Sequence, residues 1–522
     1  MTHHIFGTSA GRKPVKERST QATALVVLLL SVSVWIEATT GADQFHQQTS
    51  KSAPTQMTIN DPPEARSPFV LKAIDDRKTG LSALEYEGSA APPVIRARPG
   101  NDILITYRNR MDEQRREPCL VGPCMNMTNL HFHGLHVSPQ KGQDDVITMA
   151  ALPGETLHYR VVVPKDQPPG LYWYHTHPHG ESYQQALDGM SGALVISGIE
   201  RYAPEVLRMR ERIIVLRDKV VEEKDPDAPH LRKQVIAPVN ACGQASGMPQ
   251  RIFSVNGAIR PSIPIRSGVK QFWRIVNASP DLYADLAIPG QSLKVIALDG
   301  MPLAVHNPQE SACWMQHVLV PPASRVEAIV TGPSKGVRAM LKSRCFDTGK
   351  DGDPNPELVL ADLVDRDDSS ADSHIMKKEE AEFAPVKQLE ATAFSILKAN
   401  PPTFTARFTG DKNGFYINGS KYHPEDGPMT TATVGSFVHW RVVNDTSEVH
   451  PFHIHQVHFL TYAENGHPID NPIWLDTVNV PVGASLDLMM DFTDPIIRGL
   501  SVFHCHLLKH EDKGMMAKIL FQ

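Results

Sequence analysis

The hydrophobic pattern of this chain predicts short strands separated by turns. Short runs in which apolar and polar residues alternate, rich in Val, Ile and Thr, are interrupted by many of the 42 prolines and 34 glycines. Alternation of this kind places one side of a strand in a core and the other in solvent. We therefore expect an all-β protein with many turns.

Three of these segments resemble one another. Each runs from a glycine to an asparagine through alternating β-forming residues, and the glycines are 168 and then 167 residues apart. Each segment also has a later partner strand that begins with a similar turn. The three segments are Gly100–Asn109, Gly268–Asn277 and Gly435–Asn444, and the turns are Pro153–Glu155, Pro322–Ser324 and Val482–Ala484. A fixed period of this size predicts three consecutive antiparallel β-sandwich domains.

The repeat and the local composition suggest the domain boundaries. We place the first domain at 67–200, the second at 201–350 and the third at 385–522. Residues 351–384 are acidic and poor in apolar pattern, which is typical of an exposed linker. Residues 43–66 are expected to be a flexible lead-in.

The N-terminus has the layout of a secretion signal. Arg12, Lys13, Lys16 and Arg18 precede an uncharged stretch from about Gln21 to Ile36, and small and polar residues follow. This order of charged head, apolar middle and small-residue exit predicts that residues 1–42 direct export to a periplasm or to the medium. The apolar part is short for a membrane span, so no stable span is expected after the signal is removed.

Charge and cysteine content narrow the classes of partner. The net charge is -6 and no extended basic block occurs, which argues against nucleic acid as the main partner. An exported protein can form disulfides. The six cysteines leave the pairing open, with Cys313–Cys345 and Cys119–Cys124 as possibilities.

Histidines are concentrated in four short stretches. Thirteen of the 24 lie there, and five His-x-His patterns occur where chance gives on the order of one. The stretches are 131–136, 175–179, 450–458 and 504–510. Residues two apart on a strand project from the same face, so each His-x-His presents two imidazoles side by side, as a metal site requires. Two stretches fall in the first repeat and two in the third, which predicts a metal site between these repeats with the middle repeat as a spacer.

The last stretch predicts two kinds of site. In His504-Cys505-His506 the histidines share one face and the cysteine points to the other. Cys505 with His450, His510 and a weak Met515 ligand matches the ligand set of a blue-copper electron-transfer site. A few backbone bonds would then join this site to the metals held by His504 and His506.

These motifs resemble those of the multicopper oxidases, in the same order, over residues 67–522. The stretch from His504 to Met516 is especially similar to the bacterial copper-efflux oxidases and spore-coat laccases. The resemblance implies three cupredoxin domains of Greek-key topology and four copper ions. It implies a type 1 copper at His450, Cys505, His510 and Met515, a type 2 copper at His131 and His453, one type 3 copper at His133, His175 and His506, and the other at His177, His455 and His504.

The same resemblance implies the reaction. Dioxygen is reduced to two waters with four electrons, which a donor delivers one at a time to the type 1 site. Glu511 and Asp144 resemble the carboxylates that relay protons in this family; solvated surface acids are the alternative. His136, His179 and His458 exceed the ligand number, so we interpret them as surface groups or as groups behind the ligands. Met516 is interpreted as core packing.

Three functions compete. The first is a laccase-like oxidase of phenols and aromatic amines, with dioxygen as acceptor. The second is a metallo-oxidase of Cu(I), Fe(II) or Mn(II) that serves metal tolerance. Glu448, beside His450, could collect a cation; a solvated carboxylate at the rim is the alternative. The methionine-rich insert of the copper-efflux oxidases is absent, since the linker holds Met376 alone. The third is a copper carrier without oxidase activity, which the complete ligand set disfavours; a two-domain copper nitrite reductase is disfavoured by the three repeats.

Overall fold

The computed structural model describes residues 57–113, 126–221, 250–305, 312–367, 374–380, 383–386 and 389–522. The predicted secretion signal and Cys119, Cys124 and Cys242 lie outside these residues. None of the helices in the described part of the chain has both the length and the hydrophobicity that crossing a bilayer requires.

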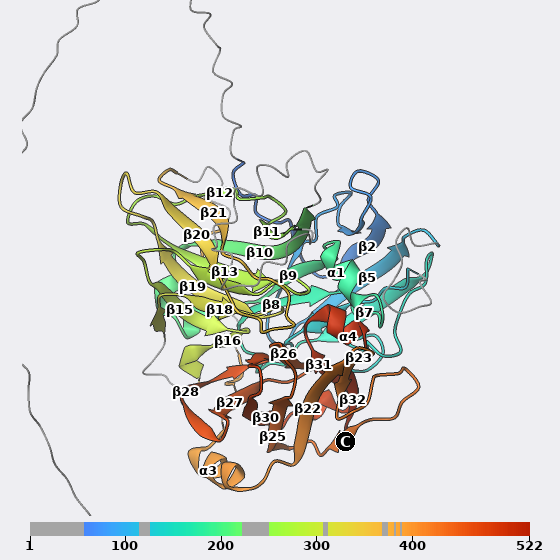
Figure 1. The fold of residues 1–522 in the computed structure, drawn as a ribbon. Helices are drawn as coiled ribbons and strands as arrows, with labels where there is room; N and C mark the ends of the chain where they lie inside the picture. Colours follow the sequence, from blue (N-terminus) through green and yellow to red (C-terminus); the bar gives the residue numbers. More distant parts are fainter. Residues whose placement is uncertain are drawn as a thin grey trace, which may run out of the picture. The chain divides into compact units, whose positions relative to one another are not determined.

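The described residues form six β-sheets in three consecutive pairs, which confirms the predicted all-β class (Figure 1). The first pair encloses a core that includes Leu71, Ile105 and Phe132. One of its sheets consists of β1 (Glu64–Ala65), β4 (Val94–Ala97), β9 (Ser191–Ile196), β8 (Gly170–His175) and β6 (His131–His133), in that spatial order. The other consists of β3 (Ser82–Glu85), β2 (Phe69–Asp75), β5 (Asp102–Arg110) and β7 (Thr156–Val162).

The second pair forms the middle domain, around a core that includes Trp273 and Leu341. One sheet has the order β11 (Gln250–Val255), β10 (Arg210–Val221), β13 (Lys270–Asn277), β19 (Arg325–Thr331), β15 (Leu293–Leu298) and β16 (Met301–Pro302), with β17 (Cys313–Met315) also paired to β15. The other has the order β12 (Ser262–Pro264), β21 (Leu358–Val364), β20 (Ala339–Arg344), β14 (Ala284–Ala287) and β18 (Val318–Val320).

The third pair encloses a core that includes Phe452, Cys505 and Met515. One sheet has the order β23 (Gly414–Ile417), β22 (Phe404–Asp411), β25 (Ser436–Asn444), β30 (Ser485–Phe492), β27 (Phe459–Glu464) and β28 (His467–Leu475). The other has the order β24 (Thr430–Ala432), β32 (Met516–Phe521), β31 (Gly499–Cys505), β26 (His450–Ile454) and β29 (Thr477–Val480). The α-helices are short: α1 (Ser182–Leu187), α3 (Ala391–Ala399) and α4 (Leu508–Asp512).

The three repeated segments occupy equivalent places in the three domains. They form β5, β13 and β25, each parallel to the first long strand of its domain and antiparallel to a later one. The asparagine that closes each segment is buried, and its side-chain amide donates hydrogen bonds to two nearby backbone carbonyls. Asn109 donates to Asn126 and Ala151, Asn277 to Leu282 and Val320, and Asn444 to Glu448 and Val480. The Gly-to-Asn signature therefore marks a strand and the anchor of its loop.

Two predicted segments differ from expectation. The exposed linker predicted over 351–384 contains β21, a largely buried strand of the middle domain, so the prediction is wrong there. The acidic composition of the surrounding residues hid this short apolar run. The end of the predicted flexible lead-in is also part of the fold, because β1 pairs with β4 and Ile59 lies in the core of the middle domain. The remaining domain boundaries stay predictions.

The cysteines also correct an expectation. Cys345 is disulfide-bonded, whereas Cys313 is free and exposed. The possible Cys313–Cys345 pair is therefore wrong, and the possible Cys119–Cys124 pair lies outside the described residues. Cys505 is free and buried, as a metal ligand should be.

Candidate metal centre

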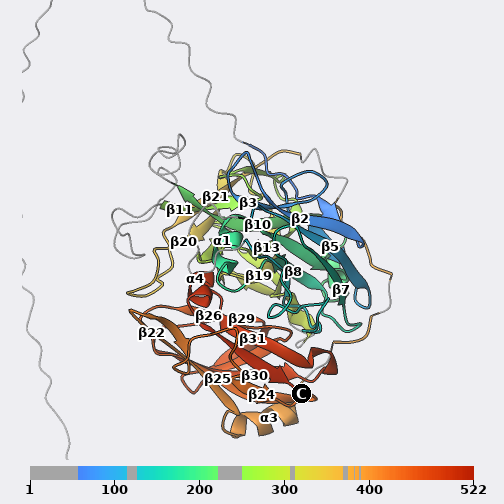
Figure 2. The same cartoon turned by 90° about the vertical axis from the view of Figure 1, so that its right-hand side faces the viewer.

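Strand pairing brings the histidine stretches together within each of the two outer domains. In the first domain β6 and β8 are antiparallel, with His131 opposite His175. In the third, β26 and β31 are antiparallel, with His453 opposite His504. Both views of the fold show β26 and β31 on the side of the third domain that faces the first two (Figures 1 and 2).

Eight histidines from these strands and from the residues after them form one buried cluster. The rings of His131 and His455 stack with centroids 3.7 Å apart, and those of His133 and His453 stack at 3.8 Å. No member is more than 1% exposed. The members are His131, His133, His175, His177, His453, His455, His504 and His506. The prediction that both ends of the chain contribute imidazoles to one site is confirmed as geometry.

Several rings of the cluster have one bonded and one unpartnered nitrogen. Nδ1 of His175 donates to the Thr176 carbonyl at 3.0 Å, and Nδ1 of His453 donates to the Asp476 carbonyl at 2.7 Å. Nε2 of both rings is buried without a hydrogen-bond partner among the described residues. Histidines that bind metals are held in this way, with the outer nitrogen bonded and the inner one free.

Two further rings repeat this pattern with carboxylates. Nδ1 of His131 lies 3.0 Å from both oxygens of Asp144 and leaves Nε2 without a partner in the described structure. His133 is turned the other way: its Nε2 lies 3.1 Å from Oδ1 of Asp476, and its Nδ1 has no partner there. Leaving such polar atoms buried and unbonded costs free energy, so the cluster fits a metal ion as the missing partner.

Burial also sets the protonation of the cluster. Removal from water lowers the pKa of the eight imidazoles below their ordinary value, and in most of them the neighbouring imidazoles lower it further. The rings are therefore neutral at physiological pH. Neutral imidazole is the form that binds Cu, Zn, Fe or Ni.

Cys505, His450 and His510 form a second site on the opposite face of β31. Sγ of Cys505 lies 3.3 Å from Nδ1 of His450 and 4.0 Å from Nδ1 of His510, and the two Nδ1 atoms are 3.4 Å apart. The outer nitrogens face other groups: Nε2 of His450 lies 2.8 Å from the Thr446 hydroxyl, and Nε2 of His510 lies 3.5 Å from Glu448. Three soft or borderline donors therefore point at one position.

The chemistry of Cys505 also fits a metal at that position. Burial raises the pKa of its thiol well above the ordinary value, so the thiolate requires a nearby cation. Met515 is fully buried in the same core cluster, and its backbone carbonyl accepts a hydrogen bond from the Cys505 N–H at 3.1 Å. The structure thus brings all four residues of the predicted blue-copper site into one region.

Both predicted proton-relay carboxylates lie beside the histidine cluster, and neither is a surface acid. Asp144 is buried and also accepts hydrogen bonds from the Phe132 N–H at 2.9 Å and from Gln456 at 2.7 Å. Burial raises its pKa to about 8. Glu511, in α4, is fully buried, with Oε2 3.1 Å from Nδ1 of His504 and Oε1 3.6 Å from Nε2 of His177. Burial, and then the neighbouring Asp512 carboxylate, raise the pKa of Glu511 well above its ordinary value.

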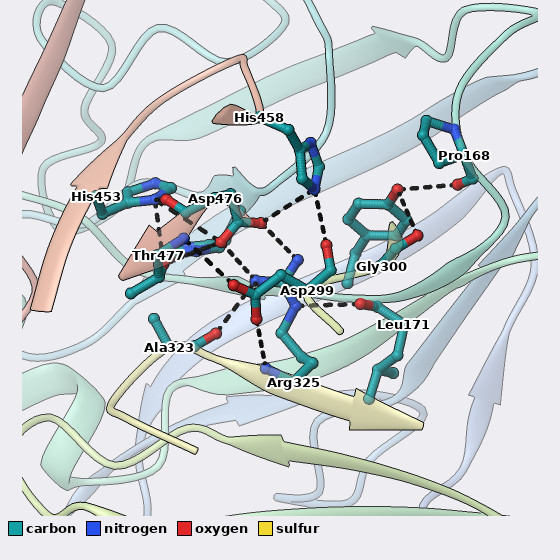
Figure 3. A network of polar contacts seen from close by, with 12 residues as sticks. Pro168, Leu171, Asp299, Gly300, Ala323, Arg325, His453, His458, Asp476 and Thr477 are labelled. Carbon is teal, nitrogen blue, oxygen red and sulfur yellow. Dashed lines mark hydrogen bonds and ion pairs between the residues drawn. The ribbon is translucent and has the colours of Figure 1, made fainter. Parts of the chain in front are cut away.

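A buried polar network that no sequence motif indicated lies beside the cluster (Figure 3). Asp476 accepts from His133 and pairs with Arg325, while Arg325 also lies 3.7 Å from Asp299. Burial opposes ionisation of Asp476, but the Arg325 guanidinium holds its pKa below the ordinary value. Arg325 and Asp299 belong to the middle domain, which is therefore more than a spacer although its described residues supply no histidine to the cluster. A lone Asp or Arg on a strand carries no motif that could have revealed this role.

The three surplus histidines lie behind or away from the cluster. His458 is buried, donates from Nε2 to the Asp299 carbonyl at 2.8 Å, and has Nδ1 2.6 Å from Nε2 of the partly buried His136. The ring of His179 packs against Tyr422. Met516 is buried in a small apolar cluster with Tyr422 and Val502.

A small cavity of about 130 Å³ lies against the Cys505 site. His510 and Phe415, whose rings stack 3.8 Å apart, form part of its wall. Its polar lining includes four carboxylates and two lysines: Asp281, Asp351, Asp353, Glu448, Lys509 and Lys513. The cavity leaves space for a small molecule to lie against His510.

Comparisons with known proteins agree with this geometry. Family models described as multicopper oxidase match residues 72–201 and 391–522, which together are about half of the chain. The chain is 23% identical to a multicopper oxidase of Staphylococcus haemolyticus, over 84% of this chain and 83% of that protein. It is 22% identical to a laccase of Bacillus subtilis, over 83% of this chain and 88% of that protein. A solved multicopper oxidase from Campylobacter jejuni, titled a metallo-oxidase, superposes with a TM-score of 0.65 at 23% identity, covering 90% of this chain and 96% of that one.

Proposed function

Because this chain belongs to the multicopper oxidase family, and is thus a copper-dependent oxidoreductase that uses dioxygen, we propose that it oxidises a small donor at His510 and reduces dioxygen at the histidine cluster. The observation that carries the proposal is the convergence of two separate donor sets on the two faces of β31. Cys505 serves one face, and His504 and His506 serve the other.

The proposed ligands follow the pairs and triplets of the cluster. His450, Cys505 and His510, with Met515 as a weak fourth ligand, would hold the type 1 copper. His131 and His453 would hold the type 2 copper, and the type 3 pair would take His133, His175 and His506 on one side and His177, His455 and His504 on the other. Nε2 of His504 lies 3.4 Å from Nε2 of His177 and 3.2 Å from that of His455, which supports the last group.

Four copper ions would supply the four electrons that convert dioxygen to two waters. The protein contributes the covalent link between the two sites, because Cys505 is bonded through the backbone to both His504 and His506. It also keeps the proposed ligands buried. Electrostatic interactions are stronger there than in bulk water, because the effective dielectric constant of a protein interior is lower.

Protons for dioxygen reduction would come from Glu511 and Asp144. The Glu511 carboxyl is held 3.1 Å from His504 in the protonated form that burial favours, so it can donate a proton next to the cluster. Glutamine has nearly the shape of glutamic acid but no acidic proton. We therefore expect Glu511→Gln to slow reoxidation by dioxygen, while copper content and donor oxidation are retained. Stopped-flow reoxidation of the reduced protein measures this; unchanged reoxidation would remove Glu511 from the relay.

The donor cavity is consistent with two substrate classes. Its size is close to the 150 Å³ or so of an engineered cavity that accepts a benzene ring, and Phe415 and Tyr283 supply aromatic walls. We therefore propose phenols and aromatic amines as donors, as in a laccase. The carboxylates of the rim favour a second candidate, a metallo-oxidase that takes Cu(I), Fe(II) or Mn(II).

Steady-state oxygen consumption with each donor class separates these functions. A laccase-like enzyme has the highest kcat/KM with a phenol or aromatic amine, and a metallo-oxidase has it with a metal ion. A protein loaded with copper that consumes no oxygen with any donor would contradict both.

We also propose export, which the charged head and apolar middle of residues 1–42 support; N-terminal sequencing of the mature protein tests it.

A further inference from the structure

One residue, Asp476, touches two of the proposed copper ligands. It lies between β28 and β29 and is fully buried. Its carboxylate Oδ1 accepts from Nε2 of His133 at 3.1 Å, and its backbone carbonyl accepts from Nδ1 of His453 at 2.7 Å. These bonds leave Nδ1 of His133 and Nε2 of His453 without a hydrogen-bond partner in the described part of the chain. The position of Asp476 therefore decides which atoms of two ligands face the metal.

Arg325 of the middle domain holds Asp476 in place. Its two terminal nitrogens donate to the two carboxylate oxygens of Asp476 at 2.8 and 2.6 Å, a bidentate pair with fixed geometry. The guanidinium also donates to the carbonyls of Leu171 at 3.1 Å and Ala323 at 3.2 Å. Leu171 lies on β8, four residues before the ligand His175. One fully buried side chain thus joins all three domains beside the cluster (Figure 3).

Two neighbours restrict this arrangement further. The carboxylate of Asp299 accepts from the Arg325 N–H at 2.8 Å and from the Thr477 N–H at 3.3 Å, which fixes the backbone on both sides of the pair. Gly134, directly after His133, packs so closely that a Cβ there would lie 2.3 Å from Asp476 Oδ2 and 2.6 Å from a terminal nitrogen of Arg325. This close packing leaves the Asp476–Arg325 pair a single position relative to His133.

Stability alone does not explain this pair. Buried ion pairs contribute little net stability, because the cost of removing both charges from water offsets their attraction. A pair of apolar side chains could fill the same space. Orientation of a ligand through its outer nitrogen, by contrast, requires an acceptor at a defined position, and loss of such an acceptor typically weakens metal binding by roughly tenfold to a hundredfold.

We propose that Arg325 is a positioning residue for the copper cluster: through the Asp476 carboxylate it fixes Nδ1 of His133 toward the metals, and it anchors the residue whose backbone carbonyl orients His453. The inference rests on the proposed function, in which this cluster binds copper. It gives the middle domain a part in building a site whose proposed ligands all come from the other two domains.

The test compares Arg325→Met with Arg274→Lys in the full chain. Arg274 is a matched control, because it is also a buried arginine of the middle domain, and its guanidinium pairs with Glu211 and Glu327 instead of with Asp476. The readouts are copper ions per chain after dialysis against a chelator, the EPR signal of the type 2 copper, and the blue absorption of the Cys505 site. The blue absorption is an internal control for folding, since Arg325 does not touch that site.

Arg325→Met is expected to retain the blue absorption, to change the type 2 EPR signal, and to lose cluster copper at roughly tenfold to a hundredfold lower chelator concentration. Arg325→Lys, which keeps the charge but not the bidentate geometry, should lie between Arg325→Met and the unaltered protein. Arg274→Lys should keep both signals. An Arg325→Met protein with unaltered EPR signal and copper retention would overturn the inference, and unaltered protein without cluster copper would instead overturn the proposed function.

A double variant keeps the inference testable if Arg325→Met does not fold. Arg325→Met with Asp476→Asn removes both charges of the pair and keeps an acceptor oxygen near His133. If Arg325 acts by positioning, the type 2 EPR signal of the double variant remains altered while its blue absorption is present. If the pair serves only to balance charge, the double variant recovers the EPR signal of the unaltered protein, and the inference is wrong.

Discussion

The imidazole ring of His131 stacks on that of His455, with centroids 3.7 Å apart and planes inclined by 17°. His131 comes from β6 of the first domain, and His455 directly follows β26 of the third. The contact joins the first and third domains at the centre of the proposed copper cluster. Both rings are neutral because burial lowers their pKa, so the stack is not opposed by charge.

Replacement of Cys505 by serine should separate the two sites. A serine hydroxyl is a poor ligand for a soft copper site, so the blue absorption and donor oxidation should be lost. The eight histidines of the cluster lie on the other face of β31 and should still bind copper. Absorption spectroscopy with copper analysis measures both effects. Loss of all copper from a folded Cys505→Ser protein would contradict the two-face arrangement.

Met515→Leu should give an active enzyme with a higher type 1 reduction potential. Removing a weak axial thioether favours the reduced copper, because the axial ligand tunes the potential of such sites. Leucine has nearly the same volume, so the buried position should tolerate it. Redox titration of the blue absorption gives the potential, and an unchanged value would mean that Met515 is not a ligand.

Much of this architecture could be predicted from the sequence, because its signals are periodic. The Gly-to-Asn segments recur at a nearly constant interval and form equivalent strands, and each His-x-His pattern places its rings on one face of a strand or of its end. The linker prediction failed where β21 lies, since the composition of a long window conceals a short apolar strand. Asp476 and Arg325 could not be found, because their role depends on the packing of three domains and not on local spacing.

Gly134→Ala should destabilise the protein more than an equivalent change elsewhere. Gly134 has φ +85, and an added Cβ would meet the Asp476–Arg325 pair. Gly154→Ala is the matched control, with φ +89 and no atom within 4 Å of its Cβ. The backbone conformation costs both variants about 1–2 kcal/mol, and overpacking should cost Gly134→Ala about 1–3 kcal/mol more. Thermal unfolding measures the order; equal midpoints would contradict the close packing at Gly134.

Glu448 should make the binding of cationic donors depend on pH. Burial, and then the neighbouring carboxylates, raise its pKa to about 8 in the protein without metal. Below its pKa the carboxyl is neutral, and above it the group is an anion that attracts a cation. Copper held by His510 favours the anion, so the midpoint should lie at or below 8.

The KM of a phenol that carries a quaternary ammonium group should therefore fall as the pH rises through this midpoint. For a partly exposed ion pair worth up to about 1 kcal/mol, the fall should be up to roughly fivefold. A neutral phenol serves as the reference donor, and Glu448→Gln should remove the difference between the two donors. A difference that persists in Glu448→Gln would place the responsible charge elsewhere in the cavity.

The central claim is that the first and third domains enclose a cluster of copper ions, which Cys505 links to a further copper ion. X-ray diffraction from crystals of the copper-loaded protein tests it most directly, with anomalous scattering recorded on both sides of the copper absorption edge. The expected map has one copper peak between Cys505, His450 and His510, and three among the eight histidines of the cluster. A map with no copper among those histidines, while the Cys505 site is filled, would contradict the account.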